Sequence, residues 1–314
     1  MTAREGPIPS RHLGLDLGGT NIKAVVVEHA DEWHVLDRDQ VATPAHDGPD
    51  AVVERLIEVG RQLMSRAPGV RTVGIGIPGL YDPATGATRF LVNIPGPWDG
   101  QPVRGPVSAA LGVPAALIND ARAFGVAESY LGAGRGASSM IGFTLGTGVG
   151  GVIVIDGRVV QGHDGTAGEM GHQTLDPDGP PCGCGNRGCL EAYARADRMA
   201  AACGTQTAEE AVDRARAGDA AALAGFASVG RWLGIGIANM VTVVTPDRVV
   251  IGGGLAVATD LMLDAIQAEL HKHVFTTSLD AVEIRTAELG TWAGAIGAAV
   301  YGAEHAALAA GVGR

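Results

Sequence analysis

One pattern of strand, glycine-rich turn and strand occurs twice in the chain. Residues 13–27 (LGLDLGGTNIKAVVV) align without a gap with residues 141–155 (IGFTLGTGVGGVIVI). In both segments an apolar run leads into a Gly/Thr-rich turn and a second, β-branched run follows, which predicts a β-hairpin. The backbone N–H groups of such a turn can form an anion-binding nest. Each hairpin alone can equally be an ordinary hairpin with convenient glycines, whereas the matched pair favours a duplicated α/β architecture with a cleft between the copies.

The rest of the chain alternates between strand and helix patterns. Further strands are predicted at 73–77, 113–118 and 249–251, and helices at 50–66, 121–131 and 208–244. A Pro/Gly-rich loop region occupies residues 82–105. At about 150 residues per domain, a chain of 314 residues corresponds to two domains.

Composition and charge argue against several classes of function. The chain has 34 acidic and 23 basic residues, a net charge of −11, and an acidic surface is repelled by nucleic acids and anionic membranes. The first residues, MTAREGPIPSRH, do not read as a signal peptide. The apolar stretch from Thr291 reaches Glu304 before it could comfortably span a bilayer. We therefore expect a cytoplasmic protein that binds neither nucleic acid nor membrane.

The cysteine-rich segment CGCGNRGCLE, residues 182–191, has the most distinctive spacing in the chain. Cys182, Cys184 and Cys189 are separated by glycines that let the backbone wrap around an ion, and thiolates suit zinc. His172, ten residues before Cys182, is the most economical fourth ligand. Such a closed Cys₃His set predicts a structural Zn²⁺, although three reduced cysteines in a turn are the alternative. Cys203 is expected to be a small core residue.

Asn119 and Asp120 lie where a predicted strand ends and a helix begins, the usual location of ligand sites in α/β sheets. Asp120 can be a general base that accepts a proton from a hydroxyl during phosphoryl transfer, or it can simply cap the helix. Glu169 and Glu191 flank the cysteine segment and can accept hydrogen bonds from sugar hydroxyls, or they can be solvated surface acids.

The second hairpin contains Gly146-x-Gly148-x-x-Gly151, the formal dinucleotide-binding spacing. That motif requires a helix directly after the glycines. Here the residues VIVI follow, which favour a strand, so the dinucleotide-binding interpretation is rejected.

Taken together, these motifs resemble the ROK family of bacterial sugar kinases and sugar-responsive repressors, over residues 12–302. DLGGTNIKA and TLGTGVGG resemble its two phosphate motifs, and GHDGTAGEMGH is similar to its glycine-rich stretch ending in Glu-x-Gly-His. CGCGNRGCLE resembles its zinc motif, and IGGG at 251–254 the segment that approaches adenosine.

The resemblance implies an α/β fold of the two-domain actin/hexokinase (ribonuclease H-like) type, with an interdomain cleft and a small zinc-bound loop. The small domain would be 1–120, completed by a C-terminal helix at 301–314, and the large domain 121–300, with the zinc motif at 172–189. The implied substrates are a hexose and ATP with Mg²⁺. The sequence indicates the phosphate donor only as a nucleoside triphosphate, and polyphosphate is an alternative donor. Relatives imply a homodimer or higher homo-oligomer.

The family's residue roles transfer by matching position. Asp120 would be the catalytic base, His172 would serve both zinc and sugar, and Asp16 would hold Mg²⁺ through water. The implied sugar-binding residues are Gly79, Asn93, Asn119, Asp120, Glu169, His172 and Glu191. The implied nucleotide-binding residues are Asp16, Gly18, Gly19, Thr20, Lys23, Gly146, Thr147, Gly148, Gly252, Gly253 and Gly254.

The chain departs from the family pattern after Asn119-Asp120, where many family glucokinases continue Ala-Asn-Ala-Ala but Arg122, Ala123 and Phe124 stand here. This departure concerns the identity of the sugar: glucose is expected, and N-acetylglucosamine or N-acetylmannosamine is the alternative. A repressor would carry a helix-turn-helix domain before the first phosphate motif, and about a dozen residues precede it here, which favours the kinase. A catalytically silent sugar sensor is disfavoured by Asp120 and both hairpins.

Overall fold

The structure is a computed structural model that describes residues 9–309, and these form two compact units. Of the described residues, unit 1 holds 9–131, 161–167 and 292–309, and unit 2 holds 132–160 and 168–291. The division differs from the boundaries at 120 and 301 that the sequence predicted. The reason is that helix α3 (Asp120–Leu131) packs on the C-terminal helix α9 (Ala293–Ala309), and both belong to unit 1. Residues 310–314 of the predicted C-terminal helix lie outside the described residues.

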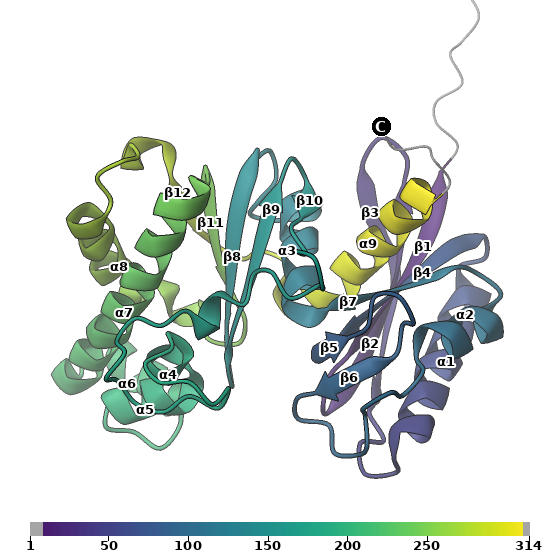
Figure 1. Cartoon of the computed structure of the whole chain (residues 1–314), viewed down its shortest axis with the longest axis horizontal. Coiled ribbons are helices and arrows are strands. Elements are labelled where there is room, and N and C mark those ends of the chain that lie inside the picture. Colours follow the sequence, from purple (N-terminus) through teal and green to yellow (C-terminus); the bar gives the residue numbers. More distant parts are fainter. Residues whose placement is uncertain (1–8, 310–314) are drawn as a thin grey trace, which may run out of the picture. The chain divides into compact units, whose positions relative to one another are not determined.

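Both units contain a five-stranded sheet with the same strand order (Figure 1). In unit 1 the order is β3-β2-β1-β4-β7, where β1, β2 and β3 pair antiparallel and β4 and β7 continue parallel to β1. In unit 2 the order is β10-β9-β8-β11-β12, with the same antiparallel and parallel pairings. The predicted duplication is therefore confirmed by the sheet topology.

The strands and helices have the following bounds. The elements of unit 1 besides α3 and α9 are β1 (Ser10–Leu17), β2 (Asn21–His29), β3 (Trp33–Ala42), α1 (Pro49–Arg66), β4 (Val70–Ile77), β5 (Gly79–Tyr81), β6 (Thr88–Leu91), α2 (Arg104–Leu111) and β7 (Ala115–Asn119). The strands of unit 2 are β8 (Ser139–Leu145), β9 (Val149–Ile155), β10 (Arg158–Val159), β11 (Arg248–Gly252) and β12 (Glu283–Thr286). Its α-helices are α4 (Glu191–Ala194), α5 (Ala196–Ala202), α6 (Ala208–Arg216), α7 (Ala220–Val244) and α8 (Thr259–His273). Single 3₁₀ turns are η1 (Met170–His172), η2 (Ala256–Ala258), η3 (Leu279–Ala281) and η4 (Gly290–Trp292).

The sheet of unit 1 has helices on both faces. Successive strand residues point to opposite sides of a sheet, and neighbouring residues of β1 accordingly contact helices on opposite faces. Leu13 of β1 lies against Gly60 of α1, whereas a Cβ added to the next residue, Gly14, would fall 1.9 Å from the Ala295 carbonyl oxygen of α9. On β4, a Cβ at Gly74 would fall 1.7 Å from the Ala298 carbonyl oxygen. The two glycines therefore let α9 lie directly on the sheet, with α3 beside it, while α1 and α2 cover the other face.

The core of unit 2 lies between its sheet and helices α7 and α8. Phe143 of β8 and Phe226 of α7 are fully buried in it. Among the helices that the structure describes, α7 alone is long and apolar enough to cross a membrane, and half of that stretch is buried within the protein. This burial is what a core helix requires.

Two local features differ from the prediction. The helix predicted over 208–244 is two helices, because the chain turns at Gly218 (φ +86°) and Asp219 then caps α7 by accepting hydrogen bonds from the Ala221 and Ala222 N–H groups. Strand β3 was not predicted, since its sequence WHVLDRDQVA is largely exposed and too charged to show a clear apolar alternation.

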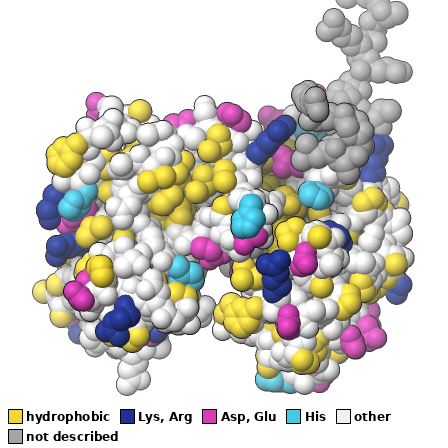
Figure 2. Space-filling view, viewed as in Figure 1, with side chains coloured by type: hydrophobic (Ala, Val, Ile, Leu, Met, Phe, Trp, Pro, Cys, Tyr) yellow, Lys and Arg dark blue, Asp and Glu magenta, His cyan; other side chains and the backbone are white. Residues whose placement is uncertain are grey.

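Lysine and arginine side chains lie scattered among acidic and apolar ones on the face that Figure 2 shows. No continuous basic surface is seen on that face, in keeping with the net charge of −11.

Candidate active site

The residues that the sequence singled out in unit 1 gather at one edge of its sheet. Strands β1, β4 and β7 are parallel neighbours, with Asp16 opposite Gly76 and Ile77 opposite Asn119. Their carboxyl ends therefore meet at the same edge, where ligands bind in open α/β sheets. Asp16, Gly79, Asn119 and Asp120 all lie at this edge.

Asn119, and not Asp120, caps helix α3. Its Oδ1 accepts hydrogen bonds from the N–H groups of Ala121 (3.0 Å) and Arg122 (3.3 Å), and its Nδ2 donates to the Gly79 carbonyl (3.2 Å). These are the bonds that a helix N-cap makes. Asp120 is the first helical residue, and its Oδ1 accepts a hydrogen bond from the neighbouring Ala121 N–H (2.8 Å). Asn119 thus supplies an acceptor for both the Ala121 and Arg122 N–H groups, so the cap does not depend on the Asp120 carboxylate.

Asp16 is a carboxyl group held in crowded surroundings. A Cβ on Gly294, in the first turn of α9, would fall 2.6 Å from Asp16 Oδ2. Burial, and next the nearby Asp120 charge, raise the pKa of Asp16 to about 7, while Lys23, its partner across the β1–β2 hairpin, acts in the opposite direction. A carboxyl group with a pKa near neutrality beside a second carboxylate is typical of functional sites.

The first glycine turn, Gly18 to Thr20, is held by a residue that the sequence analysis missed. Thr43 donates its hydroxyl to the Gly18 carbonyl (2.7 Å) and its N–H to the Thr20 carbonyl (2.9 Å). The Asn93 carbonyl also comes so close to the turn that a Cβ on Gly19 would lie 2.7 Å from its oxygen. Asn93 itself is exposed and has a positive φ of 62°.

A second feature missed from the sequence is Trp292, which lies just before α9. The Lys23 ammonium lies 6.0 Å from the centroid of its ring and the Arg38 guanidinium 5.1 Å. Both are cation–π contacts. They gather two positive charges near the strand that leaves the first glycine turn, and no local pattern linked residues so far apart in sequence.

The Cys₃His set predicted in unit 2 comes together. One ligand atom each from His172, Cys182, Cys184 and Cys189 lies within 4.8 Å of the others. The Cys184 and Cys189 sulfurs are 3.7 Å apart, and Cys182 Sγ is 3.7 Å from His172 Nδ1. Tetrahedral zinc with Zn–S bonds of about 2.3 Å requires sulfurs about 3.8 Å apart, so the four residues fit this metal. Cys203 is buried elsewhere, with its sulfur 3.4 Å from the Ala222 carbonyl oxygen, as predicted for a core residue.

Glu191 connects the cysteine cluster to the second glycine turn. Its Oε1 lies 3.6 Å from Cys182 Sγ, and its Oε2 accepts a hydrogen bond from the Val149 N–H (3.0 Å). A Cβ on Gly148 would lie 2.6 Å from Oε2, so the glycine leaves room for the carboxylate in this position. Glu191 is therefore not the freely solvated surface acid that the sequence left open.

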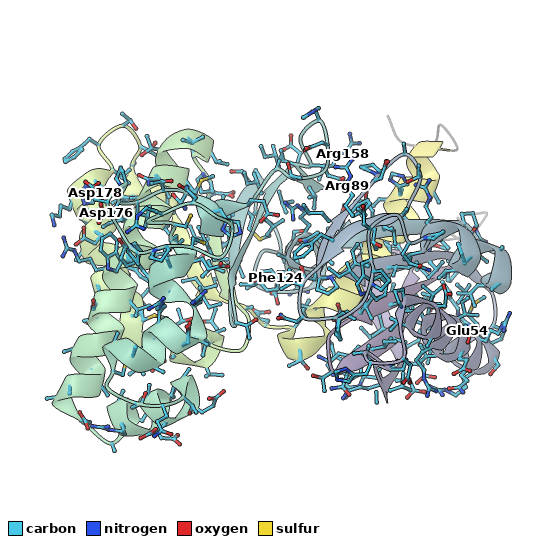
Figure 3. All side chains as sticks on the ribbon, turned by 60° about the horizontal axis from the view of Figure 1, so that its bottom comes forward. Glu54, Arg89, Phe124, Arg158, Asp176 and Asp178 are labelled. Carbon is cyan, nitrogen blue, oxygen red and sulfur yellow. The ribbon has the colours of Figure 1, made fainter. Side chains whose placement is uncertain are left out.

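The remaining predicted residues of unit 2 lie on three short segments. Glu169 is exposed and immediately precedes η1, whose last residue is His172. Because His172 Nδ1 faces Cys182, its Nε2 is the nitrogen that points away from that sulfur. Gly252 ends β11, and Gly253 (φ +85°) brings the following turn against Leu145, the residue before Gly146-Thr147-Gly148. Asp176 and Asp178, labelled in Figure 3, mark the loop that leads from η1 to Cys182.

The two residues that depart from the family pattern are both buried. Phe124 (labelled in Figure 3) is 6% exposed and Arg122 is 3% exposed. Arg122 donates from Nε (3.0 Å) and Nη2 (2.8 Å) to the carbonyl oxygen of Ala167. The sequence drew attention to Arg122 but gave no sign of this distant partner.

Known proteins resemble the chain over nearly its whole length. Residues 12–304 match the ROK family. A glucokinase from Halalkalibacterium halodurans is 33% identical over 310 aligned residues, covering 91% of this chain and 93% of the relative. The structure of a ROK hexokinase from Thermus thermophilus has a TM-score of 0.84 and 37% identity, covering 94% and 99% of the two chains. A ROK glucokinase from Streptomyces griseus, solved with glucose and AMPPNP, has a TM-score of 0.77 and 31% identity, covering 94% and 100%.

These likenesses confirm the predicted actin/hexokinase type of fold, and the matched residues contain every motif on which the resemblance rested. The chain belongs to the ROK family.

Proposed function

We propose that the protein is an ATP-dependent hexose kinase that phosphorylates the 6-hydroxyl of glucose, with Asp120 as general base. The observation that carries this proposal is the division of labour at the start of α3, where Asn119 caps the helix and Asp120 lies beside Asp16 at the ligand-binding edge of the sheet. The glucokinases among its relatives support the same activity.

In the proposed reaction, Asp120 accepts the proton of the 6-hydroxyl as its oxygen attacks the γ-phosphorus. The bond from that phosphorus to the β-phosphate oxygen breaks, and ADP leaves. Phosphoryl transfer depends chiefly on positioning and charge stabilisation. Backbone N–H groups of Gly18, Gly19 and Thr20, with Lys23, would hold phosphates from unit 1. Gly146, Thr147 and Gly148 would hold them from unit 2, and the Gly252–Gly254 turn would meet adenosine.

Mg²⁺, when bound, would neutralise charge on the transferred phosphate, and Asp16 is the residue we assign to hold it through water. The sugar hydroxyls would be read by Asn119, Glu169, His172 and Glu191, with Gly79 and Asn93 contributing through the loop after β4 and β6. Of these, Asn119 uses its Oδ1 for the helix cap and one Nδ2 hydrogen for the Gly79 carbonyl, so we expect its second Nδ2 hydrogen to meet the sugar. Zn²⁺ would hold His172 and the segment before Glu191 in place and take no part in the chemistry.

An N-acetylated amino sugar is the second candidate substrate. An N-acetyl-D-glucosamine kinase from Erwinia tasmaniensis is 33% identical over 277 residues, covering 83% of this chain and 89% of the relative.

A repressor is a candidate of another class: a putative xylose repressor from Caldicellulosiruptor is 28% identical, and this chain spans 74% of it. Binding to a DNA duplex at physiological salt, together with no turnover of any hexose, would favour the repressor. We further propose a cytoplasmic location, where ATP is available, and a homodimer or higher oligomer.

Asp120→Asn tests the assignment of the base, because it keeps the shape of the side chain and removes its basicity. We expect kcat with glucose to fall by about 10² to 10⁴, the usual contribution of a general base. Calorimetric affinity for glucose should change much less, since a hydrogen bond to the hydroxyl is retained. Asp31→Asn, at an exposed position, is the matched control and should keep normal kcat. A near-normal kcat in Asp120→Asn would contradict the assignment.

A further inference from the structure

A short loop, residues 161–167, belongs to unit 1 although the chain on both sides of it belongs to unit 2. The chain therefore enters unit 1 after Val160 and returns to unit 2 at Gly168, one residue before Glu169. What fixes this loop on unit 1 also fixes where the segment with Glu169 begins.

The loop closes on itself. The Ala167 N–H donates to the Gln161 carbonyl (3.1 Å), joining its first and last residues. Within it, Asp164 Oδ1 accepts from both the N–H (3.2 Å) and the hydroxyl (2.6 Å) of Thr166. The loop is thus a small closed unit that its anchors can hold as one body.

Each end of the loop has its own anchor in unit 1. At the first end, Gln161 Nε2 donates to the Tyr301 hydroxyl of α9 (2.6 Å). At the last end, Arg122 of α3 directs both Nε and Nη2 at the Ala167 carbonyl, at 3.0 and 2.8 Å. The guanidinium is buried, and two charge-assisted donors on one acceptor define its position more closely than a single bond does.

Resting on the proposed function, we propose that Arg122 is a positioning residue for sugar binding, acting through the Ala167 carbonyl. Asp120 and Arg122 share the first turn of α3, and Glu169 follows Ala167 by two residues. Arg122 thereby fixes the start of the Glu169 segment to the helix that carries the proposed base. Arg122, which departs from the family pattern, therefore positions the start of the segment that carries Glu169, the proposed sugar-binding carboxylate.

The test compares Arg122→Met, which keeps an unbranched apolar stem but has no donor, with Arg122→Lys, which keeps the charge but not the paired donors. In Arg122→Met we expect the KM for glucose to rise about tenfold or more, as the loss of charged hydrogen bonds implies. The KM for ATP should change by less than about twofold, because the change acts on the sugar side. The KM for glucose of Arg122→Lys should lie between those of the wild type and of Arg122→Met. Arg61→Met removes an arginine that donates to the Ala110 carbonyl at the α1–α2 contact and should behave as wild type.

Hydrogen exchange measured by mass spectrometry tests the contact between Arg122 and the Ala167 carbonyl (the Arg122 clamp) without any enzymatic turnover. Amides of residues 161–169 should exchange at least about tenfold faster in Arg122→Met, in keeping with the loss of two charged hydrogen bonds. In Arg122→Ala, added guanidinium at non-denaturing concentration should restore both slow exchange and the glucose KM. Unchanged exchange would overturn the proposal, and so would faster exchange with an unchanged KM for glucose. A wild-type protein that phosphorylates no hexose would refute the proposed function instead, and exchange would still report on the clamp.

Discussion

Asp16 lies near Asp120 at one sheet edge, and its shifted pKa predicts a pH dependence of stability. The pKa of Asp16 is raised from 3.8 to about 7 by burial first and by Asp120 second. The folded state therefore favours the protonated carboxyl. The stability that this preference contributes is fully present below about pH 3.8 and is lost as the pH rises through about 7. The full shift would correspond to about 4 kcal/mol at 1.36 kcal/mol per pKa unit, and partial solvent access of Asp16 reduces it.

Asp16→Asn should consequently stabilise the protein in the absence of nucleotide and Mg²⁺, and more so at pH 8 than at pH 5, because the amide never ionises. Denaturant unfolding at the two pH values measures this difference, with Asp31→Asn as the exposed control. The same variant should lose most of its kinase activity if Asp16 holds Mg²⁺. An equal effect on the free energy of unfolding at both pH values would contradict the shifted pKa.

At the scale of elements, the cysteine cluster joins η1, the loop after it and the start of α4. Structural zinc binding is worth on the order of 10 kcal/mol in small zinc modules. Cys184→Ala removes one ligand without opening a buried cavity, because this residue is exposed. We expect the variant to lose zinc, to unfold at a lower temperature and to bind glucose more weakly, since His172 and the segment before Glu191 lose their common support.

Elemental analysis and thermal unfolding check this expectation. Cys203→Ala is the control, because its sulfur lies outside the cluster; it should retain one zinc per chain even if the small cavity lowers its stability. Freshly purified wild-type protein without zinc would contradict the assignment of the metal.

For the molecule as a whole, features encoded by local sequence patterns could be predicted, whereas contacts between residues far apart in the chain could not. The matched hairpins predicted two units with related sheets, and the glycine-spaced cysteines predicted a Cys₃His cluster that the fold assembles. The break at Gly218 was missed because helical periodicity continues across it. The anchors Thr43, Trp292 and Arg122 were not predicted because each acts on residues at least twenty positions away along the chain.

The most direct test of the central claim is a panel of sugars assayed with Mg-ATP, with the product identified by NMR. We predict that glucose has the highest kcat/KM and that its product carries phosphate on the 6-oxygen. Mannose, N-acetylglucosamine and N-acetylmannosamine should be poorer substrates. Asp120→Asn, purified in the same way, is the control for a contaminating kinase, because a contaminant's activity would persist in the variant preparation. Negligible turnover of glucose beside rapid turnover of N-acetylglucosamine would contradict the proposed substrate, and no turnover of any sugar would contradict the proposed kinase.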